Sequence, residues 1–429
     1  MAQPRTLLHS GQVFDGTGSP PAKADVLIEG DRIIDVGPGL DGDRGVDLSG
    51  CTVCPGFIDC HVHVTLSHVN MWRYLQDPAS LMFYQTVRNL GLVLDAGITT
   101  ARDAAGADLG TKRAVEAGLI RGPRLQIAIS LISQTGGHSD GWLPSGCSLT
   151  SFAQFPGMPS PIADGTDELR KKVRELVRAG ADVIKIATSG GVMSPADDPR
   201  HAHYRPEEIR AVVEEAAAAG RHVMAHAQAA EGIKNALRAG VRSIEHGVFL
   251  DDEAIGLMLD TQAFLVPTLI AAESISAITG QGGSFDAAAG KVGLIMEAQR
   301  ASFRAALAAG VRIAFGTDAV GYPHGRNLEE IEIMVHEGMA PLEALKSATS
   351  VAASLLGIDD IGVIGPGRRA DLAIVTGDVT DVGGLRDRVR SVWQGGAEVS
   401  KKLSDVQRAV IDDEWRAIVG RSGYLNRQM

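Results

Sequence analysis

The sequence predicts a closed (β/α)8 barrel of the TIM type, to which the two ends of the chain add a small β-sandwich. Short apolar segments alternate with Ala-rich amphipathic segments through the middle of the chain, each amphipathic segment closes on Ala-Gly, and both ends alternate apolar and polar residues instead. Alternating strands and helices are typical of a parallel sheet, and eight such units favour a closed barrel. We therefore expect a β-sandwich domain of residues 1–56 plus 360–429 and a barrel domain of residues 57–359.

The flanks have the pattern of antiparallel hairpins. Residues 11–16 and 24–37 alternate apolar and polar side chains, with glycine and aspartate at the breaks, which is typical of hairpins. Residues 365–375 indicate a turn followed by a strand, and residues 389–396 a further strand. We expect the two flanks to pair with each other.

The central segments supply eight strands. They are the segment around His61 and residues 98–103, 124–129, 182–187, 222–226, 241–246, 263–267 and 311–318. The Ala-Gly pairs stand at residues 96–97, 117–118, 179–180, 219–220, 239–240 and 309–310. Glycine just past a helix end tolerates the left-handed conformation that terminates a helix. Thr166 is expected to cap one helix, and Pro206 to occupy the first turn of the next.

Three connections, residues 131–165, 188–205 and 269–292, are too long for simple turns. Each follows a strand, so each is expected on the C-terminal face of the barrel, where enzymes of this fold keep their sites. They are candidate walls and lids of a substrate pocket, although their composition also fits plain flexible loops.

The overall composition excludes several classes of protein. The formal net charge is −11 and no Lys/Arg cluster appears, so nucleic acid is not expected as a partner. No run of about 18 apolar residues indicates a membrane span, and the N-terminus lacks the apolar core of a secretory signal. We expect a cytoplasmic protein with no membrane partner. The four cysteines, among them Cys51 and Cys54 with zinc-knuckle spacing, are expected to be free thiols in ordinary strand packing.

Polar residues recur where the predicted strands end. His61 and His63 lie two apart on a strand and so share one face. A lysine inside an apolar strand is costly to bury charged, so Lys185 must be deprotonated, paired or chemically modified. If the barrel closes, residues distant in the chain converge: His61, His63, Lys185, His226, His246 and Asp318. His201 and His203 repeat the spacing of the first pair in a polar loop, where a solvated or rim position is favoured.

Several motifs together resemble the amidohydrolase superfamily, in its binuclear metal branch with a carboxylated lysine. The resemblance runs from residues 11–16 through PGFIDCHVH at 55–63 and GTD at 316–318 to residues 367–372. It implies that His61, His63 and Asp318 hold the more buried of two divalent ions and that His226 and His246 hold the more exposed one. Lys185, as a carbamate, would bridge both. Zinc is the expected metal, since imidazole and carboxylate ligands without a redox requirement suit it.

Within that superfamily, GGHSD at 136–140, residues 184–195 and Tyr204 resemble the Xaa-Pro dipeptidase (prolidase-like) and imidazolonepropionase-related group. The resemblance implies hydrolysis of the amide bond of a dipeptide or N-acyl amino acid by a metal-bridging hydroxide. Asp318 would move the proton, and His138 and Tyr204 would donate to the developing oxyanion. The expected partner is a small-molecule substrate, and a homo-oligomer stays open.

Other interpretations also stay open. The substrate could be a bulky N-acyl amino acid amide of the ochratoxin type, or a cyclic amide or lactam, because loops set the pocket shape. A single-metal deaminase usually carries a glutamate shortly after the fifth-strand histidine, whereas residues 227–230 read AQAA. A non-catalytic scaffold would be expected to have lost metal ligands, and none of the expected ligands is missing.

Overall fold

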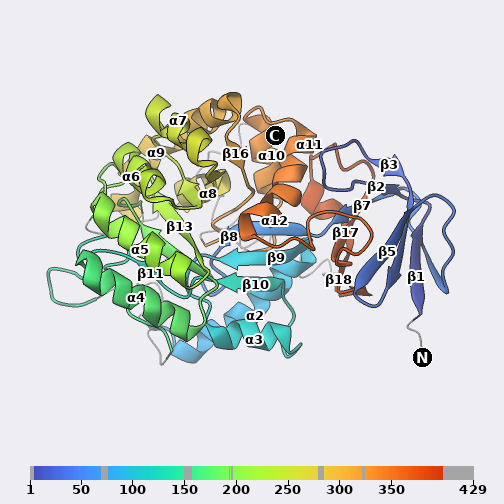
Figure 1. Ribbon diagram of the computed structural model, residues 1–429, viewed down its shortest axis with the longest axis horizontal. Helices are drawn as coiled ribbons and strands as arrows, with labels where there is room; N and C mark the ends of the chain where they lie inside the picture. Colours follow the sequence, from blue (N-terminus) through green and yellow to red (C-terminus); the bar gives the residue numbers. More distant parts are fainter. Residues whose placement is uncertain are drawn as a thin grey trace.

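The computed structural model describes residues 4–68, 76–148, 157–192, 194, 197–278, 285–320 and 324–399, with the side chains of residues 277–291 left out. Two bodies stand side by side along the long axis of the molecule (Figure 1): a ring of helices around parallel strands, and a pair of β-sheets built from the two ends of the chain. Within these residues, no helix is both long and apolar enough to cross a membrane.

The predicted (β/α)8 barrel is confirmed. Its strands are β8 (Phe57–Val62), β9 (Ile98–Asp103), β10 (Arg124–Ile127), β11 (Leu131–Ile132), β12 (Val183–Ala187), β13 (His222–Ala227), β14 (Ser243–His246), β15 (Phe264–Val266) and β16 (Arg312–Ile313). β10 pairs with β9 and β11 with β12, so these two short strands together fill the third of eight positions. The amides of Cys60 and Asp318 donate to the carbonyls of Phe315 and His61, which joins the last strand to the first.

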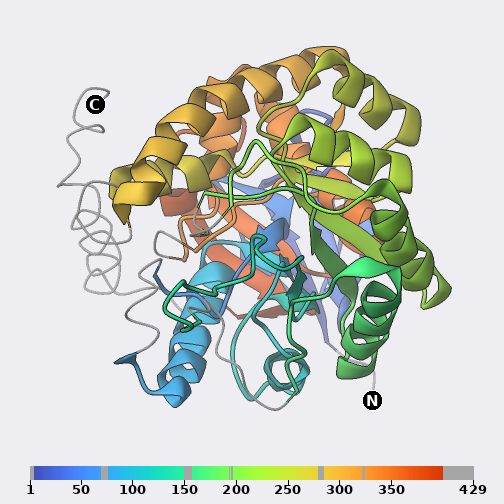
Figure 2. The ribbon, with the colours of Figure 1, turned by 90° about the vertical axis from the view of Figure 1, so that its left-hand side faces the viewer.

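The helices cover the outside of the barrel. In Figure 2 they form an arc around the central strands. They are α2 (Ala79–Asp95), α3 (Leu109–Glu116), α4 (Gly165–Ala179), α5 (Pro206–Ala218), α6 (Ala230–Ala239), α7 (Asp252–Thr261), α8 (Leu269–Ile278), α9 (Phe285–Ala309), α10 (Glu329–His336), α11 (Pro341–Ser347) and α12 (Ser350–Leu356). The glycines of all six predicted Ala-Gly stops have positive φ angles, between 67° and 100°, as the left-handed end of a helix requires.

Two local predictions about the helices are wrong. Thr166 does not cap α4, because the helix already begins at Gly165 and Asp164 holds the capping position. The connection predicted over residues 269–292 is largely helical, with α8 and the first part of α9 inside it. The glycines at residues 280–283 suggested a loop, although the apolar residues before them have the composition of a buried helix. Pro206 does occupy the first turn of α5, as expected.

The second body is a β-sandwich. One sheet has the order β5 (Arg32–Gly37), β4 (Asp25–Glu29), β1 (Arg5–His9), β6 (Arg44–Asp47). The other has the order β19 (Ala397–Glu398), β18 (Val389–Gln394), β17 (Leu372–Thr376), β7 (Cys51–Pro55), β2 (Gln12–Val13), β3 (Ala22–Lys23), and a short 3-10 helix, η1 (Leu385–Arg388), precedes β18. Antiparallel pairing of β17 with β7 joins the two ends of the chain. Val26 and Ile28 from one sheet share a core cluster with Leu372 and Trp393 from the other.

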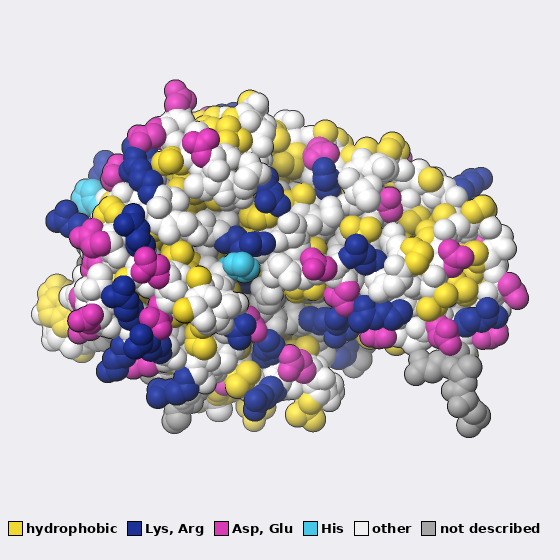
Figure 3. Space-filling view, in the orientation of Figure 1, with side chains coloured by type: hydrophobic (Ala, Val, Ile, Leu, Met, Phe, Trp, Pro, Cys, Tyr) yellow, Lys and Arg dark blue, Asp and Glu magenta, His cyan; other side chains and the backbone are white. Residues whose placement is uncertain are grey.

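The surface carries charges of both signs. On the face drawn in Figure 3, Lys and Arg side chains are interspersed with Asp and Glu side chains over the barrel helices. Cys51, Cys54, Cys60 and Cys147 are free thiols, as expected.

Candidate metal centre

The C-terminal ends of the barrel strands bring the predicted histidines and Asp318 together. The ring centroids of His61 and His246 are 5.1 Å apart, and those of His226 and His246 are 4.7 Å apart. Oδ1 of Asp318 lies 3.2 Å from Nε2 of His63 and 3.5 Å from Nε2 of His61. The contributing segments are β8, β13, β14 and the stretch after β16, so the closure of the barrel positions every one of these groups.

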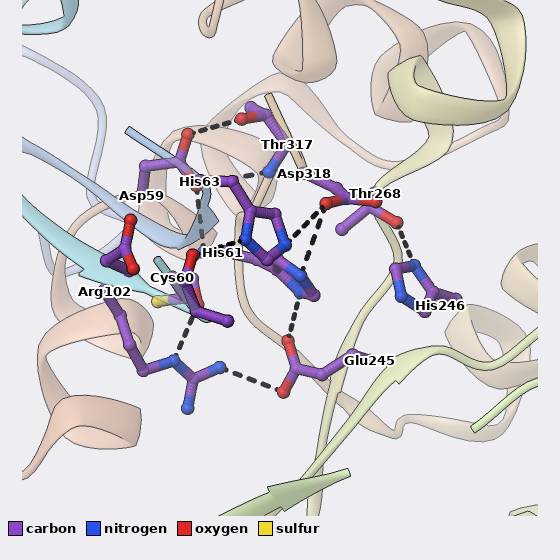
Figure 4. Close-up of polar contacts among 12 residues, drawn as sticks. Asp59, Cys60, His61, His63, Arg102, Glu245, His246, Thr268, Thr317 and Asp318 are labelled. Carbon is purple, nitrogen blue, oxygen red and sulfur yellow. Dashed lines mark hydrogen bonds and ion pairs between the residues drawn. The ribbon is translucent and has the colours of Figure 1, made fainter. Parts of the chain in front are cut away.

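The two histidines of the first strand are each held through Nδ1. In His61, Nδ1 lies 2.8 Å from Oε2 of Glu245, and in His63 it lies 2.8 Å from the carbonyl oxygen of Ala105. Because both partners are acceptors, Nδ1 carries the proton in each ring and Nε2 keeps its lone pair. Both Nε2 atoms face Asp318, as Figure 4 shows. A hydrogen bond to the nitrogen that does not bind is the usual way a protein orients a metal-ligating histidine.

The other two histidines are oriented in the same manner. Nε2 of His226 donates to the carbonyl of Gly190 at 3.1 Å, which leaves its Nδ1 free. Nδ1 of His246 lies 2.7 Å from Oγ1 of Thr268, which leaves its Nε2 free. Burial lowers the pKa of both rings well below the ordinary value for histidine. Both are therefore neutral, and the neutral imidazole is the form that binds metals.

Lys185 is a buried amine inside a barrel strand. It lies within β12 and is 2% exposed, and its Nζ has no hydrogen-bond partner among the residues that the structure describes. Burial lowers the pKa of Lys185 to about 8, while Glu245 and Asp318 act in the opposite direction. Burial is the main cause of the low pKa values of His61, His226 and His246, and the charge of Lys185 lowers all three further.

Sequence reasoning missed a buried ion pair beneath the centre. Glu245, the residue before His246, accepts from Nη2 of Arg102 at 3.0 Å through its other carboxylate oxygen, Oε1. Arg102 also donates from Nε to the carbonyl of Cys60 at 2.6 Å. Burial alone would raise the pKa of Glu245, but Arg102 and His61 hold it well below its ordinary value. The signal in the sequence was weak, because the two strands, ITTARD and SIEH, also carry other polar residues.

His138 lies against the centre. Its ring stacks on that of His226, with centroids 4.0 Å apart and planes 15° apart, and its Nδ1 lies 3.0 Å from Oγ of Ser194. The carboxylate of Asp197 is 3.7 Å from the same nitrogen. A Cβ on Gly191 would lie 2.1 Å from Cε1 of His138, so the ring needs a glycine at that position.

Tyr204 is oriented differently from the expectation for an oxyanion donor. It is 7% exposed, and its hydroxyl donates to the carbonyl of Ala163 at 2.9 Å. That bond would have to break before the hydroxyl could reach a substrate, so the role of Tyr204 stays a prediction. The expected rim position of His203 is wrong: it is 5% exposed, because its amide pairs with the carbonyl of Thr188 and draws the loop onto the barrel. His201 is exposed.

The donor set fits a pair of divalent cations. His61, His63 and Asp318 each offer one ligand atom, and these atoms all lie within 4.8 Å of one another, the one such group among the described residues. The free nitrogens of His226 and His246 form a second set nearby. Nitrogen and oxygen donors of this kind suit zinc and related ions. A buried amine that has no hydrogen-bond partner among the described residues is costly, so Lys185 differs from an ordinary residue of a barrel strand.

Comparisons with known proteins agree with this architecture. The model of the amidohydrolase family matches residues 52–401. The ochratoxinase of Aspergillus niger is 34% identical over 415 residues, covering 91% of this chain and 86% of that protein. A prolidase crystallised with N-methylphosphonate-L-proline superposes with a TM-score of 0.86 at 37% identity, covering 93% of this chain and 100% of that one. A Xaa-Pro dipeptidase with bound methionine superposes with a TM-score of 0.84 at 32% identity, covering 92% and 100%.

Proposed function

Because this chain belongs to the amidohydrolase family, we propose that it is a binuclear metal-dependent hydrolase that cleaves the amide bond of a dipeptide or an N-acyl amino acid. One observation carries the proposal: four oriented imidazoles and the carboxylate of Asp318 converge beside a buried amine that has no partner among the described residues. A barrel that served only as a scaffold would gain nothing from keeping so costly a cluster.

The proposed ligands divide into two sets. His61, His63 and Asp318 would hold one ion, and His226 and His246 the other. Lys185, after its neutral amine has added carbon dioxide and released a proton, would offer one carbamate oxygen to each ion. Zinc is the proposed metal. When bound, such a pair lowers the pKa of a water molecule and polarises the carbonyl that it contacts.

The chain's own residues would move the proton and bind the developing charge. The carboxylate of Asp318 is suited to accept the proton of the attacking water and to return it to the departing amine. His138 is proposed as a donor to the oxyanion through Nε2, in the tautomer whose Nδ1 accepts from the hydroxyl of Ser194 and whose Nε2 carries the proton. Tyr204 is proposed as a second donor, provided that its hydroxyl leaves the carbonyl of Ala163.

Two substrate classes are supported by relatives. The prolidase and the Xaa-Pro dipeptidase favour a dipeptide with a C-terminal proline, and the ochratoxinase favours a bulky N-acyl amino acid amide. Substrates of both classes carry an acyl group on the nitrogen of an amino acid whose carboxylate is free. The purified protein should be assayed against Xaa-Pro dipeptides, other dipeptides, N-acyl amino acids and ochratoxin-type amides, with lactams, hydantoins and lactones in the same buffer. Turnover of ring substrates alone would overturn the proposal.

The lysine bridge has its own test. Lys185→Ala should abolish turnover, and a short carboxylic acid should restore part of it by standing in for the carbamate. Lys112→Ala is a matched control, because Lys112 pairs with Asp182 at 2.7 Å on the outer layer of the barrel. Elemental analysis should find about two equivalents of divalent metal per native chain. Full activity with one equivalent or fewer, or unchanged turnover in the Lys185 variant, would refute the binuclear arrangement.

A further inference from the structure

A threonine next to the centre has an unusual backbone. Thr268 follows β15 and immediately precedes α8, so it stands where a helix cap is expected. It is fully buried, and its φ angle is 50°. A β-branched residue in the left-handed region is a steric outlier that persists only when its surroundings enforce it.

The hydroxyl of Thr268 is not used for the helix. A threonine before a helix ordinarily accepts from amides of the first turn, but Oγ1 of Thr268 lies 2.7 Å from Nδ1 of His246 instead (Figure 4). Because that nitrogen is the one not offered to metal, Thr268 sets the direction in which Nε2 of His246 points. The first amides of α8 therefore need another acceptor.

Glu330 supplies that acceptor from a different helix. It lies on α10 and is fully buried, and its Oε1 accepts from the amide of Leu269 at 2.8 Å. Its Oε2 accepts from the amide of Ile270 at 2.7 Å. Burial raises the pKa of Glu330 well above its ordinary value, and the hydrogen bonds from the two amides act in the opposite direction. In either protonation state its oxygens can accept from the amides that a helix N-terminus leaves without an intrahelical partner. Both oxygens therefore fix the two residues that directly follow Thr268.

We propose that Glu330 is a positioning residue for His246: by capping α8 in place of Thr268, it holds the threonine in its left-handed conformation with the hydroxyl on the histidine. The inference rests on the proposed metal centre, but it concerns metal affinity and not the choice of substrate. Glu330 accepts from the amides of Leu269 and Ile270, so its effect on His246 passes through the backbone of residues 268–270. Ordinary cap function alone would stabilise α8 without any effect on metal affinity.

Glu330→Gln and Thr268→Val test this path. The amide in Glu330→Gln keeps one acceptor oxygen but turns an NH2 group toward the second backbone amide. Thr268→Val keeps the β-branched shape and removes the hydroxyl. Both should weaken the retention of one of the two metal equivalents by roughly tenfold or more, the usual effect of removing a partner of a metal-ligating histidine. Thr268→Ser, which keeps the hydroxyl, should retain the metal.

Glu337→Gln is the matched control. Glu337 directly follows α10 and is also buried, but its carboxylate pairs with Arg300 and Arg304 on α9. The Glu337→Gln variant should have a lower urea denaturation midpoint than the native chain but should keep its metal. The measurement is the metal content after dialysis against graded concentrations of a chelator, with the urea midpoint recorded for each variant.

The outcomes separate the two proposals. The combination of Glu330→Gln and Thr268→Val should lose no more affinity than either change alone, because both interrupt one path. The inference is overturned if Glu330→Gln keeps its metal as the native chain does, or if Glu337→Gln releases metal to the same extent. A native chain that holds no divalent metal would instead overturn the proposed function.

Discussion

Replacing Glu245 by glutamine should destabilise the fold far more than a typical point substitution. The carboxylate is fully buried, Arg102 has a side chain only 3% exposed, and the two are joined at 3.0 Å. The low pKa of Glu245 means that the pair is ionised. Glu245→Gln leaves the guanidinium as an uncompensated buried charge, and breaking a buried pair in this way costs about 3–5 kcal/mol. The amide also has one carbonyl oxygen, whereas the carboxylate serves both Arg102 and Nδ1 of His61.

Urea denaturation measures this cost as a fall in the midpoint at unchanged slope. A second variant, Glu245→Gln with Arg102→Met, tests the prediction even if the single variant folds poorly. It no longer contains the unpaired guanidinium. About 2 kcal/mol or more of the lost free energy of unfolding should therefore be recovered, as a coupling energy between the two positions. A loss below about 1 kcal/mol for Glu245→Gln, or no recovery in the double variant, would refute the reasoning. The metal content of the double variant should also return toward the native value, because the single carbonyl oxygen of the glutamine no longer serves Arg102 and can accept from Nδ1 of His61.

Three further changes probe other parts of the chain. Gly191→Ala should displace the ring of His138 and lower kcat while metal content stays native, and an unaltered kcat would argue against His138 as a donor. Tyr204→Phe removes the bond to Ala163 and should cost about 1 kcal/mol of stability; a fall in kcat as well would support oxyanion binding, and native kcat would exclude it. Asp360 accepts from two arginines, which hold its pKa below its ordinary value although burial opposes this. The ionised Asp360 should therefore add to the free energy of unfolding above pH about 3.9, and this contribution should vanish as the pH falls through the lowered pKa. In an acid titration, Asp360→Asn should lose less stability than the native chain.

The regular part of the fold was predictable because it depends on local rules. Gly180 and Gly240 end their helices in left-handed conformations that few other residues tolerate, so Ala-Gly marked the helix ends correctly. Most of the barrel strands followed from short apolar segments, but β11 (Leu131–Ile132) lies inside the segment that was predicted to be a connection. His61 and His63 could be placed on one face because side chains alternate along a strand. The convergence of four strands on one point then followed from closure of the barrel.

The ion pair of Arg102 and Glu245 was missed because neither residue stands out in its strand as Lys185 does in VIKIA. The strands ITTARD and SIEH carry other polar residues, so their sequences do not show that a buried charge needs a partner there. The sequence also does not show which charged residues form a pair, since Arg102 and Glu245 lie 143 positions apart. Their pairing depends on the register and tilt of the barrel strands, which short-range patterns do not determine.

The strand ends beside the metal centre depart from the alternation rule for a physical reason. His246, Thr268 and Asp318 all have positive φ angles, of 72°, 50° and 50°, yet none is glycine. A left-handed residue turns the chain sharply, so the side chains at these points leave the faces that alternation assigns to them. Such conformations cost about 1–3 kcal/mol each, and outside glycine they carry only a weak sequence signal, the enrichment of Asn, Asp and His. They persist because remote groups hold them: the amide of Asp318 is bound by the carbonyl of His61 at 2.7 Å, and the amides after Thr268 are bound by Glu330. The geometry of this centre is therefore determined by supporting side chains as well as by the histidines, and substitutions at Thr268 and Glu330 should alter metal binding more than they alter the stability of the fold.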